Sequence, residues 1–368
     1  MKELCIKDIC KKDSSSLKQK ELKESGRYPV YGASGVAGYL DSYQQGESYI
    51  GIVKDGSGIG RVAFYPEKTS LIGTMQYILP KEGYDIRYIG YCLQSLDLSK
   101  YKQGAAIPHI YFRDYGERKV NVTNDLKEQQ RIVSRLDAAF AHIDELKANA
   151  EKQLSEARAL FQKALTKAME PKEGWEEKKF KDLCSFVRGP FGGSLKKNCF
   201  VPSGYAVYEQ QNAIYNKFSF RYFIDEEKYN SMIRFSVNPG DLIMSCSGTI
   251  GKVAIVPEGA AKGIINQALL KLSPKKVLDK YYLKYLMESS FFDSLIANYS
   301  DGAAIKNIAS VAILKEIELS IPSLSEQQRI VSRLDSLSAH VRELEEVTQK
   351  TIAECDALKQ ALLRKVFE

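Results

Sequence analysis

The ten-residue stretch EQQRIVSRLD occurs twice in the chain, at residues 128–137 and again at residues 326–335. The copies lie 198 positions apart, and the offset holds without a gap to the last residue, where Glu170 aligns with Glu368. Chance does not produce a ten-residue identity with a matching tail, and a long internal repeat determines the architecture that a sequence can adopt. The chain is therefore predicted to be an internal duplication.

Weaker similarities extend into the segments that precede each copy. GAAI at residues 104–107 recurs at residues 302–305, and GRVA at residues 60–63 resembles GKVA at residues 251–254. The rest of these two segments differs in sequence, and 368 residues are enough for two ordinary globular cores. We therefore expect four parts in the order variable domain, helix, variable domain, helix. Their predicted bounds are residues 1–124, 125–170, 171–324 and 325–368.

Both copies continue into apolar stripes whose members are spaced by three and four residues. Such heptad spacing buries a stripe against a partner helix in a coiled coil. The first copy has Ala in places where the second has Leu or Thr, so the two helices are expected to pack on each other. The alternative, in which each helix packs only on its own domain, is less favoured because each stripe persists for ~30 residues, beyond the usual length of globular helices. The stripes contain Ile132, Leu136, Ala139, Ile143, Leu146, Ala150, Gln153, Ala157, Leu160 and Ala164, and Ile330, Leu334, Leu337, Val341, Leu344, Thr348, Thr351, Cys355, Leu358 and Leu362.

Capping signals lie at the ends of both predicted helices. Asn124 and Asp125 precede the first helix, and Pro171 follows it shortly before a glycine. Ser325 precedes the second helix with Gln three residues later, a capping-box pattern that predicts Ser325 as the N-cap.

The two variable segments have the pattern of α+β domains. Alternating or β-branched runs at residues 48–53, 61–65 and 241–245 lie between turn residues and predict strands. Each segment also contains one helical candidate, at residues 85–98 and 279–297.

Composition excludes some classes of protein and leaves others open. The net charge of +7 is compatible with nucleic acid as a partner, although it does not require one. Seven cysteines without a CxxC pair, with only three scattered histidines, do not predict a metal site. No stretch has the ~20 apolar residues of a membrane span, and the N-terminus does not resemble a signal peptide. A soluble, cytoplasmic protein is expected.

Two glycine-containing loops invite a cofactor interpretation, DGSGIG at residues 55–60 and SGTIGK at residues 247–252. The first is followed by a strand-like run rather than a helix, and the second has the wrong glycine spacing for a phosphate loop. Both are better interpreted as tight hairpins. Each carries a cation at the same place, Arg61 and Lys252, and glycine allows a backbone to approach a phosphate closely. No catalytic triad or carboxylate pair is recognisable, so no catalytic residue is predicted.

Candidate DNA contacts follow from these hairpins, from a loop lysine and from an amide run that could read adenine edges. For each of them the alternative is an ordinary polar surface loop. The candidates are Lys54, Ser57, Arg61, Lys196, Gln210, Gln211, Asn212, Ser247, Thr249 and Lys252.

The sequence resembles the specificity subunits of type I restriction–modification systems. The resemblance lies in the order of the four parts and in three runs, IPSLSEQQ at residues 321–328, GDLIMSCSGTIGKVAI at residues 240–255 and GAAIKNI at residues 302–308. The first domain departs from the pattern, with IPHI at residues 107–110. The resemblance adds Lys306 and Asn307 to the candidate DNA contacts.

The resemblance implies an α+β fold with a pseudo-twofold internal repeat. It comprises two target recognition domains, each reading half of a split DNA site, joined by two long helices that pair as an antiparallel coiled coil. It also implies two methyltransferase subunits and two restriction subunits as partners, which supply S-adenosylmethionine and ATP chemistry, whereas this chain holds no cofactor and is not an enzyme. The predicted partner-binding residues come from the repeated decapeptide: Gln129, Gln130, Arg131, Arg135, Gln327, Gln328, Arg329 and Arg333.

Simple geometry sets a limit on such a spacer. A helix of the length of the repeat, residues 128–170, would span ~65 Å, or at most ~19 base pairs of duplex. Since the two domains differ in sequence, the expected DNA site is asymmetric. The rival hypothesis is a coiled-coil scaffold whose globular ends bind proteins.

Overall fold

The computed structural model describes residues 1–104, 108–191, 193–246, 249, 251–299 and 311–368. They form two compact units, Met1–Lys152 with Val347–Glu368, and Gln153–Glu346. Each unit contains one globular domain and one end of each of two long helices, α4 (Leu126–Met169) and α11 (Leu324–Phe367).

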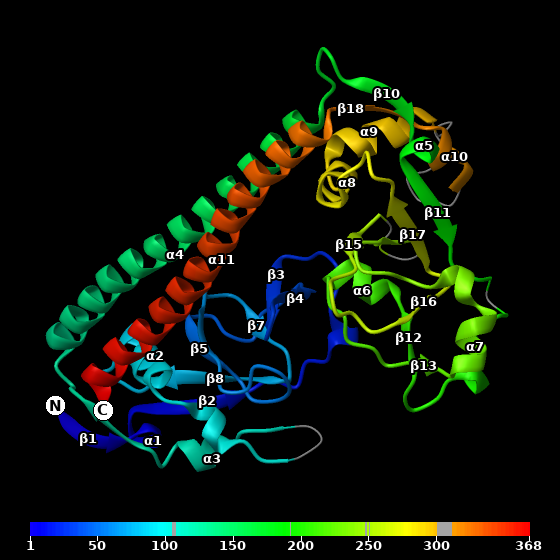
Figure 1. The fold of residues 1–368 in the computed structure, drawn as a ribbon. Coiled ribbons are helices and arrows are strands. Elements are labelled where there is room, and N and C mark those ends of the chain that lie inside the picture. The colour runs from blue at the N-terminus through cyan, green and yellow to red at the C-terminus, as the bar shows by residue number, and fades with distance from the viewer. Residues whose placement is uncertain (105–107, 192, 247–248, 250, 300–310) are drawn as a thin grey trace. The chain divides into compact units, whose positions relative to one another are not determined.

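The domain of the first unit is built on two small sheets (Figure 1). One is antiparallel with the strand order β2-β8-β5-β6, and the other has the order β4-β3-β7, with β7 parallel to β3. A separate ribbon pairs β1 with β9 and closes the start of the domain onto its end. The strands are β1 (Lys2–Cys5), β2 (Cys10–Ser14), β3 (Tyr28–Gly32), β4 (Gly35–Leu40), β5 (Tyr49–Val53), β6 (Val62–Tyr65), β7 (Ser70–Leu71), β8 (Met75–Pro80) and β9 (Lys119–Val122). The short helices are α1 (Ile6–Ile9), η1 (Gln19–Glu21), α2 (Ile86–Ser95), η2 (Leu98–Tyr101) and α3 (Phe112–Tyr115).

The domain of the second unit has the same topology. Its sheets have the orders β11-β17-β14-β15 and β13-β12-β16, with β16 parallel to β12, and the ribbon pairs β10 with β18. The strands are β10 (Glu176–Lys179), β11 (Cys184–Arg188), β12 (Tyr205–Tyr208), β13 (Phe223–Ile224), β14 (Leu242–Ser245), β15 (Val253–Ile255), β16 (Gly263–Ile265), β17 (Leu269–Pro274) and β18 (Glu318–Ile321). The helices are α5 (Phe180–Leu183), η3 (Lys197–Cys199), α6 (Gln210–Tyr215), α7 (Glu226–Ser231), η4 (Ile233–Phe235), α8 (Lys280–Met287), α9 (Ser290–Tyr299) and α10 (Val311–Glu316).

The cores explain why each domain includes helix ends. In the first unit, Ile132 and Leu136 of α4 and Leu363 and Phe367 of α11 join the core around Tyr88 of α2. In the second unit the corresponding ends of the two helices join the core around Tyr282 of α8. Each long helix is therefore held by apolar burial in a domain, which is a stronger constraint than helix propensity.

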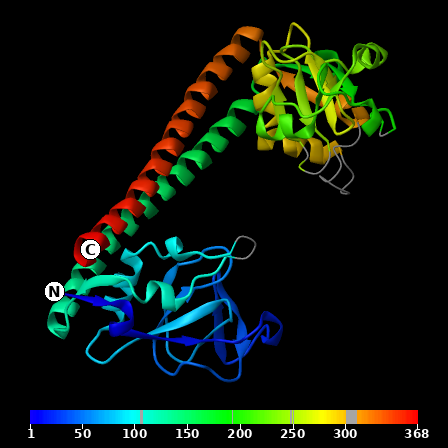
Figure 2. The same cartoon turned by 90° about the horizontal axis from the view of Figure 1, so that it is seen from below.

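Within each unit the two helix segments lie side by side and run in opposite directions (Figures 1 and 2). In the first unit Lys359 pairs with Asp144 at 2.5 Å and Lys147 pairs with Asp356 at 3.3 Å, so that position numbers rise along α4 as they fall along α11. In the second unit Arg158 pairs with a glutamate of α11. The predicted fold class, two α+β domains with two long antiparallel helices, is confirmed.

The predicted N-cap is correct for α4 and wrong for α11. Asp125 does cap α4, since its carboxylate accepts from the Lys127 N–H at 3.0 Å. The prediction that Ser325 caps α11 is wrong, because α11 begins at Leu324 and the hydroxyl of Ser323 accepts from the Glu326 N–H at 3.4 Å.

The helical candidate at residues 279–297 is two helices rather than one. α8 ends at Met287 and α9 begins at Ser290. Between them, the buried Ser289 hydroxyl donates to the Leu286 carbonyl and accepts from the Phe292 N–H, so it closes one helix and caps the next.

An ion-pair cluster fixes the edge of the second domain. Glu316, the last residue of α10, accepts hydrogen bonds from Lys179 at 2.9 Å and Lys181 at 2.7 Å. These two cations hold the pKa of the Glu316 carboxyl at about 2.

No helix among the described residues is long and apolar enough to cross a membrane.

Candidate nucleic-acid and partner interfaces

Some residues of the repeated decapeptide point inward and have a structural role. The side chain of Gln129 is fully buried, and its carbonyl oxygen accepts from the Asp85 N–H at 2.7 Å while its amide donates to the Gly83 and Thr123 carbonyls at 2.9 Å. Asp85 caps α2 through its own carboxylate. Gln129 therefore links the start of α4 to the start of α2.

Gln327 makes the same link in the second unit. It is also fully buried, accepts from the Asp279 N–H at 2.7 Å and donates to the Val277 and Pro322 carbonyls at 3.0 and 2.9 Å. Neither Gln129 nor Gln327 offers its side chain to the surface. The partner-binding prediction is therefore kept for the exposed members of the decapeptide.

The last residue of the decapeptide is also explained by the fold. Asp137 accepts a hydrogen bond from the Tyr91 hydroxyl, and Asp335 accepts one from the Tyr285 hydroxyl at 2.6 Å. Burial raises the pKa of both tyrosines, and the neighbouring carboxylate raises it further. Both hydroxyls therefore remain donors at neutral pH.

Arg131 and Arg329 lie on the outer surface in matching ion pairs. Arg131 contacts Glu128 at 2.7 Å and Arg329 contacts Glu326 at 2.7 Å, both one helical turn apart. Such exposed pairs contribute little stability. The same i,i+3 ion pair thus occurs in both copies.

Three further positions are identical in both copies and exposed. Their side chains make no hydrogen bond or ion pair with the described residues, so the fold does not account for their identity. The Gln and Ser positions, four residues apart, share one face of the helix, and the Arg position lies next to that face. These outward positions are Gln130, Ser134 and Arg135 in the first copy, and Gln328, Ser332 and Arg333 in the second.

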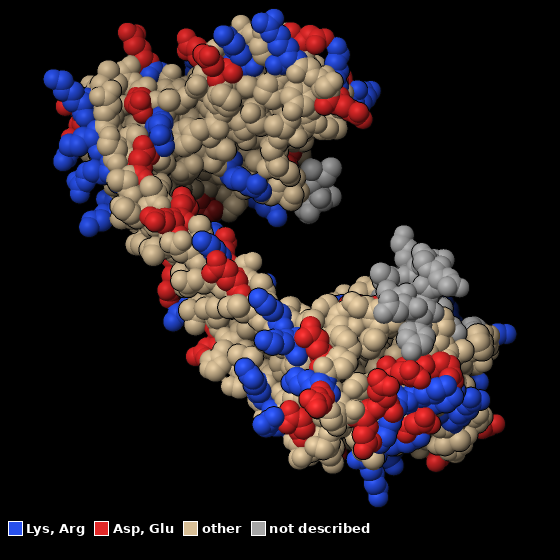
Figure 3. All heavy atoms as spheres, turned by 90° about the horizontal axis from the view of Figure 1, so that it is seen from above, with Lys and Arg blue, Asp and Glu red and all other residues tan. Residues whose placement is uncertain are grey.

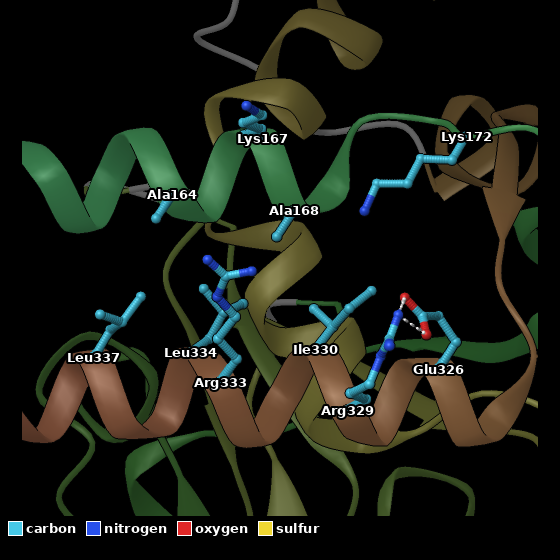
Figure 4. A pocket seen from close by; sticks show the side chains of 10 residues that line it. All are labelled: Ala164, Lys167, Ala168, Lys172, Glu326, Arg329, Ile330, Arg333, Leu334 and Leu337. Atoms are coloured by element: carbon cyan, nitrogen blue, oxygen red, sulfur yellow. Dashed lines mark hydrogen bonds and ion pairs between the residues drawn. The ribbon is translucent and has the colours of Figure 1, made fainter.

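A groove of about 510 Å³ lies beside this face in the second unit (Figure 4). Ala164 and Ala168 of α4 point toward Ile330 and Leu334 of α11, and the small alanine side chains leave the space between the helices open. Arg329, Arg333, Lys167 and Lys172 also line the groove, together with one carboxylate, that of Glu326.

Apolar side chains of the heptad stripes are not all buried. Leu337 is 36% exposed and Leu358 50% exposed, although both belong to the predicted coiled-coil seam. Leu146 and Leu160 are more exposed still, at 59% and 67%. On the face shown in Figure 3, positive and negative side chains are interspersed along the helices rather than segregated. The helix pair thus keeps apolar surface that it does not bury itself.

The candidate DNA contacts of the first domain lie on the hairpin between β5 and β6, called here the first hairpin (residues 54–61). Ser57 is exposed at its tip, and Lys54 is half-buried beside Asp55 at 4.0 Å. Arg61 is exposed, but its guanidinium also donates to the Ala33 carbonyl at 2.9 Å. The three predicted residues are therefore brought together.

The first hairpin is fixed to residues 108–110, which directly follow the first copy of the GAAI motif. Gly56 donates its N–H to the Pro108 carbonyl at 3.2 Å, and Ile110 donates to the Lys54 carbonyl at 2.9 Å. The Asp55 carboxylate lies 2.7 Å from Nδ1 of His109. Sequence reasoning missed Asp55 and His109 as neighbours because they lie far apart in the chain. The signal that could have found them is that the glycine hairpin and the GAAI run each recur in the second half of the sequence.

The corresponding hairpin of the second domain is only partly described. Lys252 and Thr249 are exposed, and the Ser245 hydroxyl accepts from the Lys252 N–H at 3.0 Å and donates to the Thr249 carbonyl at 2.6 Å. Ser247, Lys306 and Asn307 lie outside the described residues.

The amide run of the second domain separates into different roles. Asn212 is 1% exposed; it accepts from the Glu209 N–H at 2.7 Å and its amide donates to the carbonyls of Lys217 and Ser219, at 2.6 and 3.3 Å. Its side chain is thus committed to the fold.

Gln210 and Gln211 are half-buried on the same short helix, and Gln211 lies 3.5 Å from the Glu209 carboxylate. Lys196 is exposed at the start of η3. Phe191, which begins the loop that contains Lys196, is 88% exposed. Tyr215, at 68%, was not predicted, because a single exposed aromatic residue carries no sequence signal.

Among the described residues, no group of three or more His, Cys, Asp or Glu side chains could hold a metal ion. The pKa values of the Cys10 and Cys184 thiols are raised by burial to about 12, so these thiols stay protonated.

The family model and the similar curated proteins all point to one protein family. The model of the type I restriction modification DNA specificity domain matches residues 1–156 and again residues 172–354. The specificity subunit of the type I restriction enzyme EcoBI of Escherichia coli is 27% identical over 135 residues, covering 36% of this chain and 28% of that protein. The StySPI specificity subunit of Salmonella potsdam is 26% identical over 175 residues, covering 46% and 37%. The matches thus span about a third of the length of these two relatives.

Solved structures agree on the fold. A chain from a study of complex assembly and conformational transition in the type I R-M system matches with a TM-score of 0.74 at 16% identity, over 99% of this chain and 97% of that one. The HsdS subunit from Thermoanaerobacter tengcongensis matches with a TM-score of 0.55 at 16% identity, over 99% and 96%. The family model covers most of the sequence in two successive matches, and each match contains one of the two domains of equal topology. The chain therefore belongs to the family of type I restriction modification DNA specificity domains and carries that domain twice.

Proposed function

We propose that this chain is the sequence-reading subunit of a type I restriction–modification complex. Each globular domain contacts one half of a bipartite DNA site, and the two halves differ because the domains share a topology but not a sequence. Membership of the family supports this proposal, as does the clustering of Lys54, Ser57 and Arg61 on an exposed hairpin of the first domain.

The two long helices have a second function in this proposal, which is to bind two methyltransferase subunits. The observation that carries it is the identity of exposed side chains in the two copies, Gln130, Ser134 and Arg135 against Gln328, Ser332 and Arg333. Two identical partners that each grip one copy would keep these residues identical, whereas a purely structural repeat would let them diverge.

Apolar surface left on the helices supports the same proposal, since an interface core is apolar and its rim polar. The methyltransferase subunits supply S-adenosylmethionine, and two restriction subunits complete the cytoplasmic complex. Residues 128–137 and 326–335 contribute no reacting group in this arrangement. In this proposal the chain recognises the DNA sequence, and its partner subunits catalyse the reactions.

Methylation mapping tests the proposal. Genomic DNA from the host, with and without this gene, is sequenced by a method that detects methylated adenine. The expected result is one gene-dependent motif with two unlike halves separated by unspecified bases. A single continuous or palindromic motif would contradict the two-domain reading. The absence of any gene-dependent motif, combined with stable binding of other proteins by the domains, would favour a coiled-coil scaffold instead.

A further inference from the structure

The tip of the first hairpin has an unusual sequence of backbone conformations. Gly56, Gly58 and Gly60 have φ values of +86°, +86° and +82°, whereas Ser57 and Ile59 between them are not among the positive-φ residues. Alternation of left- and right-handed residues turns successive N–H groups toward one side of the chain and forms a concave nest for an anion. Glycine is the residue that adopts the left-handed positions without strain.

Three of the five N–H groups in this turn have no acceptor among the described residues. Gly56 and Gly60 donate to the Pro108 and Val53 carbonyls, which fixes both ends of the turn. The three N–H groups between them, those of Ser57, Gly58 and Ile59, donate to no described residue. Three adjacent donors without acceptors in one turn suit an anionic oxygen better than water alone.

A hollow of about 560 Å³ lies beside the residues that carry these donors. Gly56, Ser57, Gly58 and Ile59 form one wall, and Ser99, Lys102 and Pro108 form the rest. The hairpin fits closely against the opposite wall, since a Cβ on Gly60 would lie 2.9 Å from the Ser99 backbone nitrogen. The hollow is thus built by two segments far apart in sequence.

The charges around the hollow favour an anion. Lys102 is exposed on its wall, and the Arg61 guanidinium lies so close to Gly58 that a Cβ there would be 2.2 Å from one of its nitrogens. The two nearby carboxylates already have partners. Asp55 is held by His109 at 2.7 Å, and Asp97 accepts from Ser99 at 2.5 Å.

We propose that the turn at residues 56–60 is a phosphate nest that holds one backbone phosphate of duplex DNA and thereby sets the position of the first domain on its half-site. The inference rests on the proposed function and names a contact within it. Phosphate contacts of this kind position a protein without reading sequence. The second domain has Thr249 where the first has Gly58, and a β-branched residue disfavours positive φ, so the nest belongs to the first domain.

The test compares two alanine variants with matched backbone strain. Gly56 and Gly83 both have φ of +86°, and a Cβ on either meets no atom within 4 Å. Gly56→Ala changes the nest, whereas Gly83→Ala changes a turn that does not line the hollow and keeps the carbonyl that accepts from Gln129. The full chain, in complex with its methyltransferase subunits, is titrated with duplex DNA that contains the mapped site and with duplex that lacks it.

Gly56→Ala should weaken binding to both duplexes by a similar factor, roughly tenfold, and Gly83→Ala should leave both unchanged. Lys102→Gln, which leaves the backbone intact, should lower the slope of log affinity against log salt by about 0.9. A neutral methylphosphonate at one backbone position should weaken the wild type but not Gly56→Ala. Equal behaviour of the two alanine variants, or additive effects of methylphosphonate and Gly56→Ala at every position, would overturn the proposal.

A second measurement identifies the source of the phosphate. Inorganic phosphate is titrated into the chain labelled with ¹⁵N-glycine, and the Gly58 amide is followed. Two results together would reject the DNA contact: the Gly58 amide signal shifts with phosphate, and Gly56→Ala leaves the DNA affinity unchanged. The nest would then be assigned to a free phosphorylated ligand. If the wild-type complex binds no duplex at all, the proposed function fails, and the Gly58 titration alone decides whether the nest binds phosphate.

Discussion

Replacing Gln327 by alanine should destabilise the second unit, whereas replacing its neighbour Gln328 should not. The Gln327 side chain is fully buried and makes three hydrogen bonds to backbone groups of Asp279, Val277 and Pro322. Gln328 is identical in both copies as well, but its side chain is exposed. Comparing the two variants therefore distinguishes a residue that is identical in both repeats because the fold requires it from one that is identical for another reason.

The size of the effect follows from those three bonds. Each contributes a net ~1 kcal/mol, and a buried group left without a partner costs more. Alanine removes the Gln327 amide, so the Asp279 N–H and the Val277 and Pro322 carbonyls lose this partner. The expected loss is about 2 to 3 kcal/mol in the free energy of unfolding, against less than about 0.5 kcal/mol for Gln328→Ala.

The chain contains a convenient reporter for this measurement. Trp175 is its only tryptophan and packs against the core of the second unit. Urea unfolding followed by Trp175 fluorescence therefore reports the unit that contains Gln327. An equal shift of the midpoint for the two variants, or none for Gln327→Ala, would refute the structural role given to this side chain.

Three shorter predictions follow from other parts of the structure. Charge reversal at the two exposed arginines, Arg135→Glu with Arg333→Glu, should reduce co-purification of methyltransferase subunits at least tenfold without changing the unfolding midpoint; unchanged co-purification would count against the helix interface. Asn212→Ala should cost about 2 kcal/mol because three backbone partners lose their bonds, which urea titration measures. Glu316→Gln should remove a source of acid sensitivity: the folded pKa of about 2 lies below its ordinary value of 4.5, so the carboxylate stabilises the fold above pH 4.5 and loses this effect as pH falls toward 2. The melting temperatures of Glu316→Gln and wild type should therefore differ at pH 6 and converge near pH 2, and a difference that does not narrow as pH falls would be inconsistent with the ion pairs.

The repeat and the heptads were sufficient to predict the fold class because they are long-range regularities of the sequence. A strict identity at residues 128–137 and 326–335 needs no knowledge of tertiary structure to be recognised. The error at the start of α11 has the opposite origin. Ser323 and Ser325 offer the same hydroxyl, and it is Ser323 that caps, because α11 begins at Leu324, directly after it.

The candidate site was less predictable for a related reason. Asn212 was expected to face DNA, but in the structure its side chain accepts from the Glu209 N–H at the start of α6. No local pattern could show that His109 holds Asp55, because the contact joins residues 54 positions apart. Polar residues whose partners are distant in sequence look the same as polar residues that await a ligand.

The two copies of the helical repeat have diverged at positions that pack against the domains, so one copy can no longer replace the other. In the first unit, Phe140 of α4 packs against Tyr91 at 5.4 Å and lies under Lys359 of α11 at 5.3 Å. The repeat aligns Phe140 with Ser338 and Lys359 with Phe161. In the second unit Phe161 packs near Tyr285 at 6.5 Å instead.

One large ring thus covers the tyrosine in each unit, but it comes from opposite positions of the repeat, and α4 supplies it both times. A dimer of two first halves would set Phe140 against Phe161 at both ends, and a dimer of two second halves would set Ser338 against Lys359, with no ring at either. Phe161→Lys should therefore cost about 1 to 2 kcal/mol through the lost ring contact. Adding Ser338→Phe, which recreates the arrangement of the first unit, should recover most of that loss in the Trp175 unfolding curve. The ring contacts lead us to expect that the intact chain is more stable than a dimer of either half. A double variant no more stable than Phe161→Lys alone would show that a ring at position 338 cannot replace the ring at position 161. It would then remove this reason for the expectation.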